Sequence, residues 1–377
     1  MVLTRSLSNS RGSKSKVQTV INNKIETYLE RKYRISKSHA TRESYRFIVY
    51  RFVDFIQIQY KQDFETFLGT LTQSDTDPIG ILDEYFTYLS NGDKPLANNS
   101  IRGYLTIAKD FLNYLGCKIY IEDIKQRFRL PKARHVYEEG LTKETINRIV
   151  RFANPKLATA ILMLCSSGMR ISELLQLRTQ DIDFTKNPTT ILVRAETTKT
   201  RETRITCISS EAANTLQDYI KRYKITEHLF IKNNHESEED YIQNVLTTRQ
   251  SFERMLHHVR NNIPELNKKS ENGRNVIHFH ALRAWFKTQV TDAHQSDFAE
   301  ALMGHKSLKL VYYRQNDKAR AQTYLDVEHS LTISDTEKID NNYSQMQKDN
   351  QELRGIVDSL SRQLQNLEKR IEFRKKN

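Results

Sequence analysis

Apolar residues recur three and four positions apart from about residue 38 to residue 124 of this 377-residue chain. That spacing is the period of an amphipathic helix, which buries one face and exposes the other. The turn residues Asn91, Gly92 and Gly116 separate the apolar stretches and end the predicted helices. Residues 38–124 are therefore predicted to form a compact helical domain, in which the stripe of aromatic side chains forms the core.

A different pattern follows downstream, where two short segments alternate between apolar and polar residues. The sequences TTILVR (189–194) and TRITCIS (203–209) have the period of two that is typical of half-buried strands. The polar sequence AETTKTRE joins them, so the pair is predicted to form a hairpin.

Helical patterns surround this hairpin. Residues 155–165 are apolar nearly all round, which predicts a buried helix, and further helices are expected near residues 208–223 and 251–259. The acidic sequence NNHESEED (233–240) is expected to be a surface loop. Residues 142–334 are thus predicted to form a mixed α/β domain, and the fold as a whole is expected to be mainly α with a small β-sheet (α+β).

Three segments flank these two predicted domains. Residues 1–37 are polar and basic, with one weakly amphipathic helix near residues 20–33, and indicate an N-terminal extension that is either solvated or in contact with DNA. Residues 125–141 are densely basic and contain Pro131, which indicates an interdomain linker suited to a chain that wraps a duplex. Residues 335–377 carry apolar residues in alternating steps of four and three, with Asn350 at an a position. This heptad pattern predicts a C-terminal coiled-coil helix that forms a dimer, with antiparallel packing onto another helix as the alternative.

The composition of the chain indicates what kind of partner it binds. Lysine and arginine number 59 against 46 aspartates and glutamates, a formal net charge of +13 that favours a polyanionic partner. Charge alone does not distinguish nucleic acid from an anionic membrane. The chain has no apolar run of membrane-spanning length and no signal peptide at its amino terminus, so a soluble, cytoplasmic protein with no membrane partner is expected. The widely spaced Cys117, Cys165 and Cys207 predict buried thiols, without a disulfide framework or a zinc site.

The segment 278–314 concentrates side chains that act in phosphate chemistry. They are His280, Arg283, His305 and the pair Tyr312 and Tyr313. His280 and Arg283 stand three residues apart and therefore share one face of a helix. Gly304 ends a short apolar helix and puts His305 at a turn. An arginine that binds phosphate oxygens, imidazoles that move protons and a phenol that attacks together indicate phosphate chemistry without a metal.

Such a site needs further cations, and two candidates lie upstream. Arg170 follows the turn Ser167-Gly168 and is expected at the amino terminus of a helix, where its guanidinium and the backbone N–H groups could hold a phosphate. Lys199 lies on the connection between the two predicted strands, where a lysine is usually only solvated. The neighbouring Arg201 and Arg204 make a basic groove at this hairpin plausible.

In this order and spacing, these residues resemble the tyrosine recombinases, the phage integrase family. The resemblance covers about residues 38–330. It rests on Arg170 in SSGMRISELLQL, Lys199 on the hairpin, His280 and Arg283 in HALR, His305 in LMGH, and a downstream tyrosine. The sequence YYRQ and the LDVEHSLTI that follows are more similar to integrases of archaea or mobile elements. The resemblance implies a helical core-binding domain over 38–124 and a catalytic domain over 142–334.

The same resemblance implies a reaction and roles for these residues. Tyr313 would attack a DNA phosphate to give a 3′-phosphotyrosine and a free 5′-hydroxyl, and Tyr313 is favoured over Tyr312 by its offset from His305. Arg170 and Arg283 would neutralise the phosphorane, and Lys199 would protonate the leaving 5′ oxygen. His280 and His305 would assist proton transfer and phosphate binding. No metal or other cofactor is implied. The implied partners are double-stranded DNA at specific recombination sites and three further protomers, which complete a homotetramer on DNA.

Three other functions use parts of the same pattern. A type IB topoisomerase has nearly the same residues but relaxes DNA without pairing two sites. An architectural DNA-binding protein with a dimerising coiled coil would need the basic charge and none of the catalytic residues. A metal site at His278, His280 and His305 is the weakest alternative, because no carboxylate or cysteine stands at ligand spacing.

Overall fold

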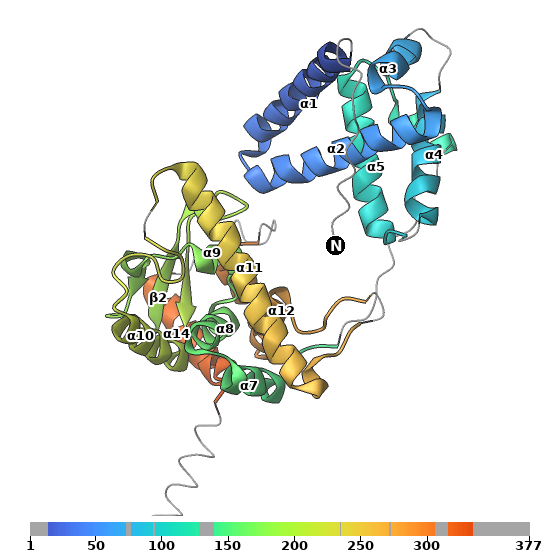
Figure 1. The fold of residues 1–377 in the computed structure, drawn as a ribbon. Coiled ribbons are helices and arrows are strands. Elements are labelled where there is room, and N and C mark those ends of the chain that lie inside the picture. Colours follow the sequence, from blue (N-terminus) through green and yellow to red (C-terminus); the bar gives the residue numbers. More distant parts are fainter. Residues whose placement is uncertain are drawn as a thin grey trace, which may run out of the picture. The chain divides into compact units, whose positions relative to one another are not determined.

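The computed structural model describes residues 14–72, 77–92, 95–127, 139–233, 235–270, 273–305 and 316–334. The chain divides into two compact units, Met1–His135 and Val136–Asn377. Figure 1 shows helices throughout and a small sheet in the second unit. Helices predominate and the sheet is small, so the predicted α+β fold class is confirmed.

The first unit is helical in all its described elements. Its helices are α1 (Lys14–Ser36), α2 (His39–Tyr60), α3 (Phe64–Thr72), α4 (Pro78–Asn91), α5 (Asn98–Tyr114) and α6 (Ile121–Arg127). Side-chain caps fix two of the helix starts, because Ser38 accepts from the Thr41 backbone N–H and Asp77 accepts from that of Ile79. The aromatic side chains predicted to form the core are buried at its centre, among them Phe52 and Phe111.

Helix α1 includes the helix expected near residues 20–33, but its apolar face is buried and not part of a solvated extension. Its Ile25, Tyr28 and Leu29 are at most 1% exposed and pack in the core of the first unit. The Tyr28 hydroxyl donates to the Asp110 carboxylate on α5 at 2.6 Å, and Lys32 pairs with the same carboxylate. The apolar stripe of this helix is narrow and flanked by charges, so its burial depends on α2 and α5 more than on its own sequence.

The second unit combines helices with the small sheet. Its elements in chain order are α7 (Lys143–Phe152), α8 (Pro155–Ser167), α9 (Ile171–Leu175), η1 (Thr179–Asp181), β1 (Ile182–Asp183), β2 (Thr189–Val193), η2 (Ala195–Thr197), β3 (Arg204–Ile208), α10 (Ser210–Tyr223), α11 (Glu238–Asn262), η3 (Pro264–Leu266), α12 (Phe279–Asp292), α13 (Ser296–Met303) and α14 (Asp317–Leu331).

Helix α8 lies at the centre of the second unit. It is buried nearly all round, as its uninterrupted apolar sequence predicts, and it packs against α7, α10, α12 and β3. Asn154 caps its start by accepting from the Leu157 N–H, and Gly168 ends it with a left-handed φ of 62°. The chain therefore turns sharply after α8 and enters α9 at Arg170.

The sheet has the antiparallel order β1, β2, β3. The predicted hairpin is confirmed as β2 and β3, and its last pair before the connection joins Val193 to Arg204. The short strand β1 was not predicted, because two residues are too few to show an alternating pattern. The prediction of an acidic loop over residues 233–240 was wrong in part. Glu238, Glu239 and Asp240 form the first turn of α11, where carboxylates interact favourably with the helix dipole.

Several predicted features lie outside the described residues. They are most of the basic linker, the tyrosine pair Tyr312 and Tyr313, and the coiled-coil segment 335–377. Among the helices that the structure does describe, none combines the length and the apolar character needed to cross a membrane.

Candidate functional site

A basic cavity of about 480 Å³ opens where the start of α9 and the start of α12 meet helix α11. Its basic lining residues are Arg170, Arg249, Arg260, Arg274, His278, His280 and Arg283, and Glu253 is the carboxylate among its described lining residues. Three of the predicted site residues, Arg170, His280 and Arg283, therefore share one cavity. An excess of guanidinium and imidazole groups around one cavity suits an anionic ligand.

Arg170 is held at the mouth of this cavity by its own helix. Its backbone N–H donates to Glu173 Oε2, and its Nη1 donates to Glu173 Oε1, each at 2.9 Å. The Arg170 side chain keeps 27% of its surface exposed, so the guanidinium has a protein partner on one side and solvent on the other. Helix α9 has only five residues, so the expected contribution of its backbone to phosphate binding is small and the guanidinium is the relevant group.

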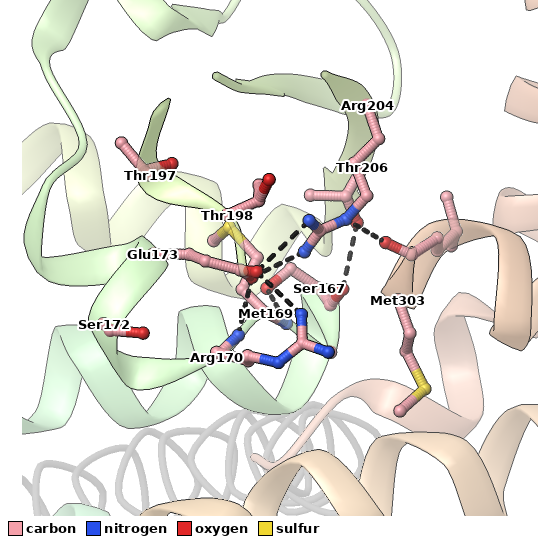
Figure 2. A network of polar contacts seen from close by, with 12 residues as sticks. Ser167, Met169, Arg170, Ser172, Glu173, Thr197, Thr198, Arg204, Thr206 and Met303 are labelled. Atoms are coloured by element: carbon pink, nitrogen blue, oxygen red, sulfur yellow. Dashed lines mark hydrogen bonds and ion pairs between the residues drawn. The ribbon is translucent and has the colours of Figure 1, made fainter. Parts of the chain in front are cut away.

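Glu173 was not singled out from the sequence, although it organises this part of the site. Its side chain is fully buried, and its carboxylate lies between the guanidinium groups of Arg170 and Arg204 (Figure 2). Burial opposes ionisation, but the hydrogen bonds and charges of Arg204 and Arg170 prevail and lower the pKa of Glu173. The available signal was an acidic residue three positions after Arg170, between apolar residues of the segment ISELL.

Arg283 lies deeper, on the second turn of α12, and is 2% exposed. It donates to the backbone carbonyl oxygens of Gly168 and of Met303, the latter at 2.9 Å. Burial and the nearby Arg170 lower the pKa of Arg283 to about 10, so the group remains charged at pH 7. The two carbonyls connect Arg283 to the end of α8 and to the end of α13, and this fixes the direction of its guanidinium.

His305 follows the turn at Gly304, which has a φ of 70° and ends α13 as predicted. Glu300 Oε2 lies 2.6 Å from His305 Nδ1, and Arg283 Nη2 lies 2.9 Å from His305 Nε2. A carboxylate accepts and a guanidinium donates, so His305 carries its proton on Nδ1 and presents the Nε2 lone pair to Arg283. Lys287 pairs with the other oxygen of Glu300. Glu300 was not predicted from the sequence, because its partner Lys287 becomes a neighbour only when α12 and α13 pack together.

His280 lies in the first turn of α12, where it faces the cavity one helical turn before Arg283. Burial lowers its pKa from the ordinary value of 6.5, and the charges of Arg283 and His278 lower it further. His280 is consequently a neutral imidazole at pH 7, able to accept a proton. The ring of His278 lies 6.5 Å away, centroid to centroid, and its Nδ1 donates to the carbonyl oxygens of Asn275 and Val276.

The structure does not bring Lys199 into this cavity. Lys199 is exposed in the connection between β2 and β3 and is absent from the lining of the basic cavity. Thr198 beside it is 6% exposed; its hydroxyl donates to the carbonyl of Ala195 and accepts from the N–H of Glu202, which closes the base of this turn.

Other residues bear on the predicted chemistry. Arg249, Arg260 and Arg274 add charge to the cavity but could not be assigned from sequence, because they come from segments without a recognisable motif.

Among the residues that the structure describes, no three histidine, cysteine or acidic side chains gather in a way that could hold a metal ion.

Comparison with known proteins relates this site to a family. Residues 139–320 match the phage integrase family. A tyrosine recombinase of Pseudothermotoga lettingae is 27% identical over 179 residues, which cover 46% of this chain and 61% of that protein. Tyrosine recombinase XerC of Pediococcus pentosaceus is 27% identical over 270 residues, 66% of this chain and 83% of that protein.

A crystal structure of a lambda integrase dimer bound to a COC′ core site has a similar fold. Its TM-score is 0.50 at 14% identity, over 78% of this chain and 98% of that one. The chain spans about three fifths of the length of the curated relatives that it matches first. The family match covers the part of the chain that holds Arg170, His280, Arg283 and His305, and it identifies residues 139–320 as a domain of the phage integrase family, similar to curated tyrosine recombinases.

Proposed function

We propose that the protein is a site-specific DNA recombinase that cleaves and rejoins DNA strands through a 3′-phosphotyrosine intermediate. The observation that carries this proposal is the meeting of Arg170, Arg283 and the neutral imidazole of His280 in one basic cavity. Two guanidinium groups match the nonbridging oxygens of a phosphodiester, and their charge balances the charge that develops as a fifth oxygen bonds to phosphorus.

In the proposed reaction Tyr313 is the nucleophile. Its phenolic oxygen forms a bond to the scissile phosphorus while the bond from phosphorus to the 5′ oxygen breaks. The proton of the phenol passes to His280, which is neutral at pH 7. The leaving 5′ oxygen takes a proton from Lys199, on a hairpin that would approach the DNA when the duplex binds. The phosphotyrosine keeps the energy of the broken bond, so rejoining requires only attack by a 5′-hydroxyl.

His305 supports this site through Arg283. Its Nε2 accepts from Arg283 Nη2 in the DNA-free protein, while Glu300 holds its Nδ1. His305 can therefore keep Arg283 directed towards the phosphate, and its Nε2 could donate to a phosphate oxygen only after taking up a proton.

In this function the chain binds one kind of partner, and its segments have different roles. The partner is double-stranded DNA carrying specific recombination sites, and exchange between two duplexes needs four protomers. Residues 38–124 are assigned as the core-binding domain, 125–141 as a basic linker over the duplex, and 142–334 as the catalytic domain. The net charge of +13 supports binding along the DNA backbone.

Covalent trapping tests this function. Duplexes that the protein retains from a random-sequence library would supply a binding site, and a nick placed beside the scissile phosphate would let the short 5′ product diffuse away. We expect wild-type protein to form a denaturation-resistant adduct with this DNA. Tyr312→Phe should retain the adduct and Tyr313→Phe should lose it.

The alternatives predict other outcomes. Tight binding without an adduct from any variant would contradict the proposal and favour an architectural protein. An adduct together with relaxation of supercoiled plasmid lacking the selected site would favour a topoisomerase. Cleavage that requires the site, followed by exchange between two site-bearing duplexes, would support recombination.

A further inference from the structure

Arg204 joins three segments that carry candidate site residues. Its Nη2 donates to Glu173 Oε2 at 2.6 Å and its Nε donates to the Leu302 carbonyl at 2.8 Å. Glu173 holds Arg170, and Leu302 lies three residues before His305. Arg204 is also the first residue of β3, directly after the turn that bears Lys199. One side chain thereby connects α9, the end of α13 and the β2–β3 hairpin.

The surroundings of Arg204 hold it in one position. Its side chain is 10% exposed, and a Cβ atom at Gly304 would lie 2.9 Å from Arg204 Cδ. Thr206 on the same strand donates to the Ser167 carbonyl at 2.9 Å, which fixes β3 to the end of α8. The glycine at the turn before His305 therefore leaves the space that this arginine occupies.

The position of Arg204 beside Glu173 balances the charge of this buried carboxylate. Glu173 is fully buried and needs positive charge beside it to stay ionised. Arg204 makes the shortest contact to it, at 2.6 Å, compared with 2.9 Å for Arg170 (Figure 2). With Arg204 in place, Arg170 shares the carboxylate and can still offer donors to an incoming phosphate. Without Arg204, Glu173 would retain only Arg170 as its ionic partner among the described contacts, and the guanidinium would be drawn away from the ligand.

We propose that Arg204 is a positioning residue that neutralises Glu173 and so keeps the Arg170 guanidinium available to the scissile phosphate. This inference rests on the proposed function. Arg204 itself touches no reacting atom in this assignment and acts through Arg170.

The test compares two nicked duplexes that differ at one group. One has a normal scissile phosphate, and the other has a methylphosphonate there, in which a methyl group replaces a charged nonbridging oxygen. In single-turnover cleavage at saturating protein, we expect Arg204→Gln to be about a hundredfold slower than wild type on the phosphate. The neutral methylphosphonate requires less charge stabilisation from Arg170. On this duplex, Arg204→Gln should therefore slow cleavage by less than about tenfold.

Arg194→Gln is the matched control. Arg194 directly follows β2, at the same end of the hairpin as Arg204 but on the opposite strand. Its side chain is 15% exposed, and it pairs with the buried Asp181 while donating to the Gln176 carbonyl. It resembles Arg204 in burial and in partners but makes no described contact to Glu173. Its substitution should change cleavage of the two duplexes by equal factors. Arg204→Lys keeps the charge and should show the selective loss in weaker form if Arg204→Gln folds poorly.

A second readout uses an Arg170→Ala background, in which Arg204→Gln should slow cleavage by less than about threefold. Equal losses on both duplexes, or a full loss in the Arg170→Ala background, would overturn the role of Arg204. Failure of wild-type protein to cleave the phosphate duplex would instead overturn the proposed function.

Discussion

At the scale of single residues, the second unit places charges where water is scarce. Arg283 is almost completely buried, yet its donors meet two carbonyl oxygens and the His305 ring. A guanidinium held in this way attracts a phosphate more strongly than a solvated one does, because less water screens the interaction. Burial is the larger cause of the lowered pKa of His280, and the charge of Arg283, one helical turn away, lowers this pKa further.

The lowered pKa of His280 predicts the pH dependence of cleavage. Only the neutral ring accepts a proton, so activity should be full above the pKa and fall as the pH drops through it. The midpoint should lie below 6.5, the ordinary value of histidine. Cleavage rates measured between pH 5 and 8, with protein well below its dissociation constant, report the titration of the free protein.

His280→Gln provides the comparison for this profile. The variant should cleave more slowly, by about a hundredfold, and its rate should lack the limb that falls at acidic pH. A wild-type midpoint at or above 7, or the same limb in His280→Gln, would show that another group controls the acidic side.

At the scale of elements, the sequence predicted the features that depend on interactions between neighbouring residues. Gly304 ends α13, Arg170 begins α9, and the alternating segments pair as β2 and β3 because caps, turns and alternation are properties of neighbouring residues. Glu173 and Glu300 could not be found in the same way. Each holds a site residue close to it in sequence, but the basic groups that keep it ionised, Arg204 and Lys287, arrive from other elements.

The turn between α8 and α9 gives a prediction at this scale. Gly168 has a φ of 62°, and a Cβ atom there would lie 2.3 Å from Cδ1 of the buried Phe286 on α12. Gly168→Ala should therefore lower the free energy of unfolding by about 1–3 kcal/mol, through backbone strain and overpacking. Urea titration can follow this through Trp285, the single tryptophan of the chain, which is buried beside Phe286.

Gly140→Ala is the control for this substitution. An added Cβ at Gly140 meets no heavy atom within 4 Å, so the free energy of unfolding should change by less than about 0.5 kcal/mol. Equal effects of the two substitutions would contradict the explanation by a close contact at Gly168.

At the scale of the whole molecule, the sequence predicted which residues share a cavity. It did not predict the hydrogen bonds and ion pairs that hold them there. Arg170, His280 and Arg283 meet in one cavity although Arg170 is far from the others in the chain. Their order and spacing resemble a family, and that resemblance supplied the long-range information that periodicity lacks. The exposed position of Lys199 is the exception, since a hairpin turn can contact a ligand without lining a cavity of the DNA-free protein.

The heptad pattern of residues 335–377 gives the last prediction, which depends on the proposed function. A tail that pairs protomers would raise their local concentration and favour assembly of two DNA sites without taking part in the chemistry. A chain ending at Ser334 should form the covalent adduct at a single site at a rate within about threefold of the full chain. Exchange between two site-bearing duplexes should become about tenfold slower at low protein concentration.

Sedimentation velocity checks the physical cause of this loss. Without DNA, the full chain should sediment as a dimer at micromolar concentration and the shortened chain as a monomer. Asn350→Leu in the full chain supplies a matched variant, because an apolar residue at an a position stabilises a coiled coil while relaxing its choice of register and partner number. If both the full and the shortened chain sediment as monomers, the dimerising tail is rejected and packing within one chain is favoured, since an intrachain helix does not change the number of chains in the sedimenting species.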